Sequence, residues 1–258
     1  MSTKSGFPRF VYIFVTFFLI APLVVLVVAS FNASRSMQWE RFSLEWYRRL
    51  FFQSRDLWRA VLNSVVIAVS SATVATTIGS LAAIGIRWGR FRLKSYVQTV
   101  TLMPLLLPEI ILGVSLLIFF ASIGVPLGLV TIFIAHTCFN LPFVILIVLA
   151  RLEEFDYSII EAAYDLGARE RDTLLRVIVP VSMPGILSAF LTAVTLSLED
   201  FVITFFVAGP GSTTLPLYVY SAIRFGVSPV INALSVVMIT VTVALVLLSR
   251  NVLKYIAK

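Results

Sequence analysis

The sequence predicts an all-α polytopic membrane protein with six transmembrane helices. Of its 258 residues, 59% are hydrophobic and only 13% are charged, whereas soluble domains are about half apolar and about a quarter charged. Apolar runs of about 20 residues, long enough to cross about 30 Å of hydrocarbon, occur six times. We therefore expect one transmembrane domain over residues 1–258. The spans are placed near Phe10–Ala29, Ala60–Ile86, Tyr96–Ser122, Leu129–Ala150, Pro184–Ala208 and Ile231–Ser249.

The composition excludes several functional classes. The single cysteine, Cys138, lies inside an apolar run, so the chain has neither a disulfide framework nor a zinc site. It also lacks a Walker A loop, a nucleophile triad and a metal-binding cluster, so we predict no catalytic residue and no metal site. The net charge of +7 comes from basic residues in loops beside the spans, which orientation in the membrane explains better than nucleic-acid binding.

The first span is expected to be retained, and the segment 32–59 after it is expected on the outer face of the membrane. Residues Glu40–Arg59 are predicted to form an interfacial helix, and an ordinary structured loop is the alternative. Four apolar residues recur there at helical spacing, and three tryptophans suit the headgroup level: Leu44, Tyr47, Leu50 and Phe51, with Trp39, Trp46 and Trp58.

The second span has a small residue at every fourth position. These residues are Ser71, Ala75, Gly79 and Ala83. Because small side chains let two helix backbones approach closely, this stripe predicts helix packing.

The third span combines two prolines with an acid. Pro104 and Pro108 free backbone carbonyls and predict a bent helix that faces protein or a cavity. By helical rise, Glu109 is expected about 18 Å from the cytoplasmic end, near the middle of the bilayer. An ionisable group there is a functional candidate. The alternative is that Glu109 is neutral or bonded within the helix bundle.

Polar residues in the fourth and fifth spans complete a candidate substrate pathway with Glu109. His136 and Asn140 are four residues apart and share a helix face, so they either line the pathway or bond to each other or to a neighbour. Glu199 and Asp200 are adjacent, and their repulsion favours a wet site or a cation. Because the spans hold three acids and no Lys or Arg, such a pathway would attract cations.

Between the fourth and fifth spans, residues 158–180 form a charged island. Ser158 and Glu161 have the spacing of a capping box, and Gly167 stands where a left-handed C-terminal cap would. A second turn of helix is expected to follow, and Pro180 is expected to end it before the next span. The island is therefore predicted to be a helix-turn-helix elbow.

The segment 209–230 after the fifth span is too polar to cross the membrane and is expected on the outer face. It contains Gly-Pro-Gly at 209–211 and then a short predicted helix around Tyr218–Phe225. We expect either a re-entrant element over the pathway or a receptor for an outside partner.

The elbow resembles the EAA loop of ABC-importer permease subunits. Glu161-Ala162-Ala163, Gly167 and, further on, Val177, Val179 and Pro180 match that pattern, with valines where the family has isoleucine and leucine. In that family the short helix is the coupling helix, which lies in a groove of the cytosolic ATPase. A solvated connection with ordinary caps is the alternative. The resemblance implies the type I ABC-importer permease fold and a coupling role for Glu161, Ala162, Ala163, Asp165, Gly167 and Pro180.

The chain is also similar to the spermidine/putrescine importer permeases over nearly its whole length. The family usually has an acid where this chain has Val230, so a cation contact expected there is absent. Related permeases for oxyanions also carry an acid near the place of Asp200, so the inference of a cationic cargo depends on Glu109 and Glu199. The matching residues are Phe31–Arg35, Trp46-Tyr47, Pro108-Glu109, Ser197–Pro216 and Tyr220–Ser235.

The resemblance implies uptake of polyamines by an ATP-driven importer. This would combine the chain with a second permease, two copies of a cytosolic ATPase and a periplasmic or surface-tethered polyamine-binding protein, all in contact with membrane lipid. ATP and Mg would be bound by the partner ATPase, and no cofactor by this chain. The alternatives are a permease for another organic cation, a metal or an oxyanion and, from other classes, a membrane-embedded enzyme or a free-standing channel.

The basic residues and the elbow together predict the orientation. The loop Arg87–Lys94 has four bases and no acid, and short basic loops stay on the cytoplasmic side. With six spans, both termini then lie in the cytoplasm, and the resemblance implies the bacterial inner membrane.

Overall fold

The computed structural model describes residues 6–34, 38–89, 92–154, 156–224 and 229–256, with side chains of the last range described to residue 244. In these ranges the chain is helical, apart from turns and one isolated bridge between Asn32 and Phe42. It forms two compact units, Met1–Asp56 with Val219–Lys258, and Leu57–Tyr218. This division does not decide the prediction of one transmembrane domain over residues 1–258, and we describe the two units in turn.

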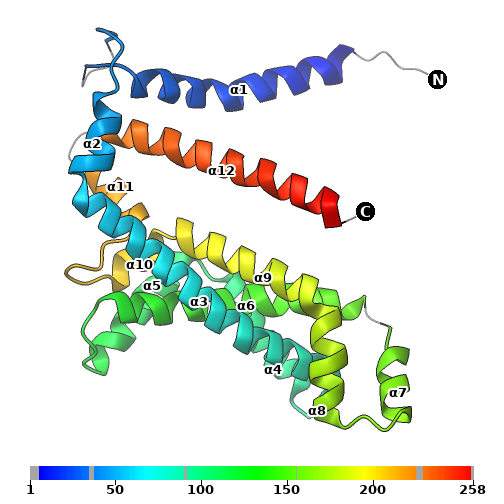
Figure 1. The fold of residues 1–258 in the computed structure, drawn as a ribbon. Helices are drawn as coiled ribbons and strands as arrows, with labels where there is room; N and C mark the ends of the chain where they lie inside the picture. Colours follow the sequence, from blue (N-terminus) through cyan, green and yellow to red (C-terminus); the bar gives the residue numbers. More distant parts are fainter. Residues whose placement is uncertain (1–5, 35–37, 90–91, 155, 225–228, 257–258) are drawn as a thin grey trace. The chain divides into compact units, whose positions relative to one another are not determined.

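The smaller unit contains α1 (Gly6–Ser30), α2 (Glu45–Gln53) and α12 (Pro229–Ile256), and Figure 1 shows α1 and α12 in blue and in orange to red. Helix α12 packs against both α1 and α2. The chain between α1 and α2 is fixed by Asn32, whose side-chain oxygen accepts hydrogen bonds from the N–H groups of Ser34 and Glu40. The indole N–H of Trp46 donates to the Asn32 carbonyl at 2.7 Å.

The interfacial helix predicted over Glu40–Arg59 is correct only in its middle. The helix is α2, and the chain breaks at Ser54 before α3 begins. Trp46, which suited the headgroup level, is instead buried beside Leu50 because its N–H has a protein partner. Trp39 is exposed.

The larger unit is a helical bundle with two buried clusters. One cluster joins α3, α6 and α9 around Ala75, Val144 and Ala189, and the other joins α5, α6 and α10 around Phe120 and Ile203. The elements in chain order are α3 (Arg55–Trp88), α4 (Lys94–Leu102), a 3-10 turn (Met103–Leu106), α5 (Glu109–Ser122), α6 (Leu129–Glu153), α7 (Ser158–Asp165), α8 (Glu170–Thr173), a π-helical turn (Leu174–Ile178), α9 (Val179–Glu199), α10 (Val202–Val207) and α11 (Leu215–Arg224), which starts in this unit.

The helices confirm the all-α polytopic class, although the spans are not six uniform rods. Among the described residues, four helices are long and apolar enough to cross a membrane, and a bent pair brings the number to five. The last predicted span corresponds to α12, whose apolar part with described side chains is shorter. The four continuous helices are Phe7–Ser30, Arg55–Trp88, Leu129–Glu153 and Glu170–Glu199.

The bend predicted at the prolines of the third span is confirmed. The helix Lys94–Leu106 stops before Pro108, and Glu109–Ser122 continues at an angle of 107°. Because Glu109 begins a new helix, the straight helix assumed in the depth estimate of about 18 Å is wrong.

Two predictions about the fifth span are also wrong. Its helix ends at Glu199 and not at Ala208, and Pro180 does not end the helix before it, because Glu170–Glu199 is continuous. The N–H of Val179 donates to the carbonyl of Leu174, five residues back, which forms a wide π-helical turn. This turn adjusts the backbone where Pro180 supplies no N–H, so the helix passes through the proline.

The small-residue stripe of α3 packs closely against α6, as predicted. Ser71, Ala75 and Ala83 are fully buried. A Cβ added to Gly79 would lie 2.6 Å from Cγ1 of Val144 on α6. A glycine is therefore needed at position 79 for α3 and α6 to reach their observed contact.

The segment between α10 and α11 is held against α3 and the loop before α6. The side chain of Asn63 donates to the Thr213 carbonyl at 3.0 Å, and the Leu215 N–H donates to Ser64 Oγ at 2.8 Å. A Cβ on Gly209 would lie 1.9 Å from the Leu127 carbonyl oxygen. Helix α11 confirms the predicted short helix, except that Phe225 lies outside the described residues.

We expect opposite effects from two alanine substitutions on α3. Gly79→Ala should lower the free energy of unfolding by about 1–3 kcal/mol, because the methyl group would overlap Val144. Gly85→Ala should raise it by up to about 1 kcal/mol, because an added Cβ there meets no atom within 4 Å and alanine favours helix. Thermal unfolding of the purified transport complex measures both. Equal effects of the two substitutions would contradict the packing described.

Candidate functional site

The elbow begins at an aspartate cap that the sequence analysis missed. Oδ1 of Asp156 accepts a hydrogen bond from the Ser158 N–H at 3.0 Å, and Ser158 is the first residue of α7. The predicted capping box of Ser158 and Glu161 is therefore wrong, because Ser158 already lies inside the helix. The bond from the backbone N–H of Ser158, together with one from its side chain, holds the pKa of Asp156 below its usual range. The signal was an Asp two residues before the helix start.

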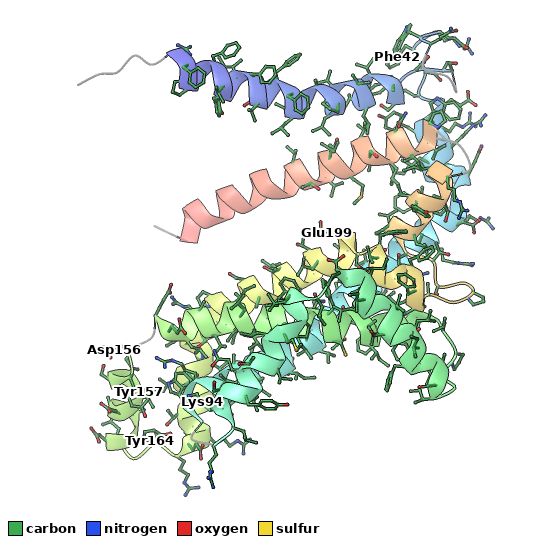
Figure 2. All side chains as sticks on the ribbon, turned by 180° about the vertical axis from the view of Figure 1, so that it is seen from behind. Phe42, Lys94, Asp156, Tyr157, Tyr164 and Glu199 are labelled. Carbon is green, nitrogen blue, oxygen red and sulfur yellow. The ribbon has the colours of Figure 1, made fainter. Side chains whose placement is uncertain are left out.

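Helix α7 has one face packed on the bundle and one face exposed. Ile160 is buried in the cluster that also contains Ile86 and Ile178. The exposed face of α7 includes Glu161, Ala162 and Asp165. Leu166, just after the helix, is 89% exposed. Figure 2 labels Asp156, Tyr157 and Tyr164 on this segment. An exposed short helix with both acids and apolar side chains is suited to contact with another protein.

Gly167 ends α7 in the left-handed conformation that the sequence predicted. Its φ is +80°, and no atom lies within 4 Å of an added Cβ. The Gly167 N–H donates to the Tyr164 carbonyl at 2.8 Å, and the Ala168 N–H donates to the Ala163 carbonyl at 3.0 Å. These two bonds form a Schellman motif, which fixes the angle between α7 and α8.

Glu109 and Glu199 are the acids on which the predicted cationic pathway depends. One lies at the N-terminal end of a helix and the other at a C-terminal end. Glu109 is the first residue of α5, where the helix dipole stabilises a carboxylate. Glu199 is the last residue of α9, where the dipole disfavours one. Both side chains are exposed, and neither belongs to an ion pair in the part of the chain described. Figure 2 labels Glu199 at the end of α9. Glu199 therefore lacks the local structural explanation that Glu109 has.

Asp200 is instead part of a buried network with His136. His136 Nε2 lies 3.1 Å from Asp200 Oδ2 and 2.9 Å from Thr204 Oγ1, and His136 Nδ1 lies 2.6 Å from Ser197 Oγ. The Asp200 carboxylate also accepts the N–H groups of Ile203 and Thr204, at 3.2 Å and 2.9 Å. Asp200 thus caps α10 where the chain leaves α9.

This network separates the five residues predicted for a pathway into two groups. His136, Asp200 and Asn140 are at most 7% exposed, so in this conformation they do not face a passage, whereas Glu109 and Glu199 are exposed. His136 bonds across helices and not to Asn140, whose side-chain atoms have no hydrogen-bond partner among the described residues. The sequence analysis missed Ser197 and Thr204, although polar residues three and four positions from Asp200 were a usable signal.

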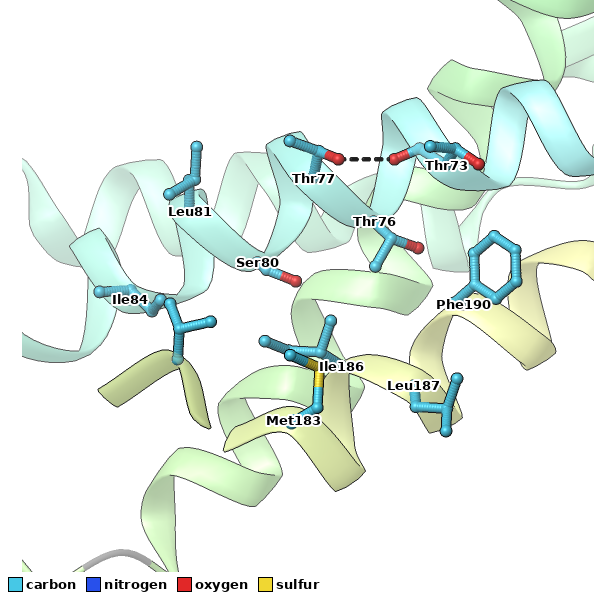
Figure 3. A pocket seen from close by; sticks show the side chains of 11 residues that line it. Thr73, Thr76, Thr77, Ser80, Leu81, Ile84, Met183, Ile186, Leu187 and Phe190 are labelled. Atoms are coloured by element: carbon cyan, nitrogen blue, oxygen red, sulfur yellow. Dashed lines mark hydrogen bonds between the residues drawn. The ribbon is translucent and has the colours of Figure 1, made fainter. Parts of the chain in front are cut away.

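A groove of about 370 Å³ between α3 and α9 is separate from the acids (Figure 3). Met183, Leu187 and Phe190 form its apolar wall. The hydroxyls of Thr76 and Ser80 on the opposite wall have no partner among the described residues. Neither Glu109 nor Glu199 lines this groove, so its chemistry does not bear on the charged pathway.

Residues 75–258 match the family described as the binding-protein-dependent transport system inner membrane component. The chain belongs to this family. It is therefore a membrane permease subunit of an ABC transporter and not an enzyme. A member of the family works as the inner-membrane part of a larger transport system, and the apolar helices of this permease agree with that location.

Two curated relatives resemble the permease along most of its length. It is 38% identical over 248 residues to the spermidine/putrescine transport system permease protein PotC of Escherichia coli (strain K12), a match that covers 96% of this chain and 92% of that protein. It is 42% identical over 226 residues to the putrescine transport system permease protein PotI of the same strain, which covers 84% of this chain and 80% of that protein.

Solved transporter structures share the fold of the permease. A bacterial ABC transporter involved in the import of the acidic polysaccharide alginate aligns with a TM-score of 0.73 at 15% identity, covering 97% of this chain and 98% of that one. The inward-facing MetNI methionine ABC transporter aligns with a TM-score of 0.61 at 22% identity, covering 75% and 92%. At these identities the alignments establish the permease fold and nothing about the cargo.

Adjacent acids at the end of α9 should respond differently to alanine. Asp200→Ala should lower the free energy of unfolding by about 3–5 kcal/mol, because it removes the buried acceptor of the Ile203 and Thr204 N–H groups and one of the partners of His136. Glu199→Ala should change it by less than about 0.5 kcal/mol, because Glu199 is exposed. Thermal unfolding of the purified complex measures the difference, and an equal loss at both positions would contradict the capping role of Asp200.

Proposed function

We propose that this permease forms, with a second permease subunit, the membrane passage of an ATP-driven importer for polyamines such as spermidine and putrescine. The observation that carries the proposal is the similarity to PotC and PotI, named as spermidine/putrescine and putrescine permeases, along most of the chain. The exposed acids support a cationic cargo, because the described spans offer them no basic partner. The alternative is another small solute: another organic cation, a metal or an oxyanion.

Glu199 is the strongest candidate for contact with the cargo, and Glu109 is the second. A carboxylate at the C-terminal end of a helix is destabilised by the helix dipole, and an ammonium group of the cargo would offset that effect. The helix dipole at the start of α5 stabilises the Glu109 carboxylate, so Glu109 has a structural explanation that does not require contact with the cargo. His136, Asn140 and Asp200 remain proposed members of the passage only in a conformation that exposes them.

The elbow is proposed as the contact with a cytosolic ATPase. The exposed face of α7, with Glu161, Ala162 and Asp165, would meet the ATPase, while buried Ile160 transmits movement to the bundle. The Schellman motif at Gly167 supports this role, because a helix that transmits force must keep a fixed angle to the next one. Pro180 would act through the π-helical turn that precedes it, where α8 continues into α9.

The remaining partners follow from this assignment. We propose two copies of the ATPase, which would bind ATP and Mg, and a periplasmic or surface-tethered polyamine-binding protein near the outer segments 32–59 and 209–230. The basic loop Arg87–Lys94 and the elbow support a cytoplasmic position for both termini. The terminal residues themselves, 1–5 and 257–258, lie outside the described residues.

The coupling role predicts a specific response to substitutions of Gly167. Gly167→Val should lower uptake and substrate-stimulated ATP hydrolysis, because a β-branched residue at a φ of +80° is strained by about 1–2 kcal/mol or more. Gly167→Asn should retain more activity, because asparagine tolerates this conformation. Both are measured in reconstituted vesicles with the full complex. Undiminished coupling in the valine variant, at normal membrane insertion, would refute the proposed role.

The cargo role predicts that charge, and not shape, matters at the exposed acids. Glu199→Gln should lower putrescine uptake about tenfold, as expected for the loss of one charge-assisted contact, and Glu109→Gln should lower it less. The affinity of the separate binding protein should not change. Glu153→Gln, at an exposed acid at the end of α6, is the matched control. Full uptake by the Glu109→Gln, Glu199→Gln double variant would remove both acids from the passage.

A further inference from the structure

A cavity of about 290 Å³ lies between the end of α3, helix α7 and the start of α8. Residues of the elbow form part of its wall, and none of the acids proposed for the passage lines it. The residues of its wall that carry the argument are Gly85, Trp88, Tyr157, Ile160, Tyr164 and Glu170.

The wall combines three aromatic side chains with one carboxylate. Aromatic faces attract organic cations, and tyrosine and tryptophan do so in sites that recognise substituted ammonium groups. Glu170 supplies a negative charge at the cavity wall. A hard metal ion would need several oxygen ligands, whereas Glu170 is the single acid among the described residues of this wall.

Glu170 is exposed. Arg169 and Arg171 flank it in the sequence, yet none of the ion pairs in the described ranges includes Glu170. By contrast, Asp172 on the same helix lies 3.6 Å from Arg176. Tyr157 and Tyr164 are 49% and 47% exposed, so their rings are accessible as well.

Gly85 gives the cavity part of its space. A Cβ added at Gly85 would meet no atom within 4 Å, whereas the same atom at Gly79 would overlap α6. A side chain introduced at position 85 therefore extends into free space at the cavity wall. This makes position 85 a suitable reporter of occupancy.

We propose that this cavity binds an aliphatic ammonium ion, a second cation site distinct from the passage. Its position on the cytoplasmic side, and the choice of putrescine as the ligand to test, rest on the proposed function. The ammonium group contacts Glu170 and the tyrosine rings, and the methylene chain lies against Ile160 and Trp88. A ligand there touches α3, α7 and α8 together, and so restrains the movement of the elbow.

The test is protection of a cysteine placed at position 85. The exposed Cys138 is first replaced by alanine, and Gly85→Cys is labelled with an impermeant maleimide in inside-out membrane vesicles that contain the whole transport complex. Putrescine should slow the labelling, whereas 1,4-butanediol, of similar length but uncharged, should not. Glu170→Gln should raise the putrescine concentration for half protection about tenfold. Tyr164→Leu should raise it as well.

Two controls test whether protection by putrescine is specific to the cavity. The labelling rate is measured without transport, so it is independent of the proposed function. Asp172→Asn should leave protection unchanged, and a cysteine at the exposed Ser95, which does not line the cavity, should label at the same rate with and without putrescine. The proposal is refuted if putrescine gives no protection, if Glu170→Gln is protected like the parent, or if an ATPase side chain blocks labelling regardless of putrescine. The labelling needs no ATP and no uptake, so a complex that fails to transport polyamines refutes the proposed function separately.

Discussion

The close contact of α6 with α3 and α9 is the constraint on which the larger unit depends. Added Cβ atoms at Gly79 and Gly185 would each lie 2.6 Å from side-chain atoms of α6, those of Val144 and Arg151. Because the helices meet this closely, the N-terminal third of α6 brings His136 to the end of α9, and the C-terminal end of α6 leads into the elbow. A wider separation would break the buried hydrogen bonds that hold α10.

The break between α9 and α10 shows how this contact permits an irregular backbone inside the bundle. N–H groups freed at such a break need partners within the protein. Asp200 accepts two of them, and His136 from α6 binds the same carboxylate. The network therefore gives Asp200 a structural role that needs no contact with a cargo. The neighbouring Glu199 lies outside the network, exposed at a helix end that disfavours negative charge. Adjacent acids thus have different roles.

The elbow is likewise held by specific contacts at its ends and on one face. Asp156 fixes the start of α7, Gly167 fixes its end, and Ile160 attaches it to the buried cluster. These three contacts make α7 a rigid short helix with an exposed face. The helix after it runs without interruption from Glu170 to Glu199. In the proposed function, a displacement of the elbow would therefore reach Glu199 through one continuous helix.

The sequence by itself determined the membrane class, the helical stripe of α3, the bend at Pro108 and the left-handed cap at Gly167, because each depends on local composition or on one residue's backbone preference. Tertiary structure alone decided the rest. It placed Asp200 in a buried network and Glu199 outside it, although the two are neighbours in sequence, because partners from α6 and α10 reach only one of them. It also carried the helix through Pro180, since a π-helical turn there accommodates the missing N–H, and no local pattern specifies such a turn.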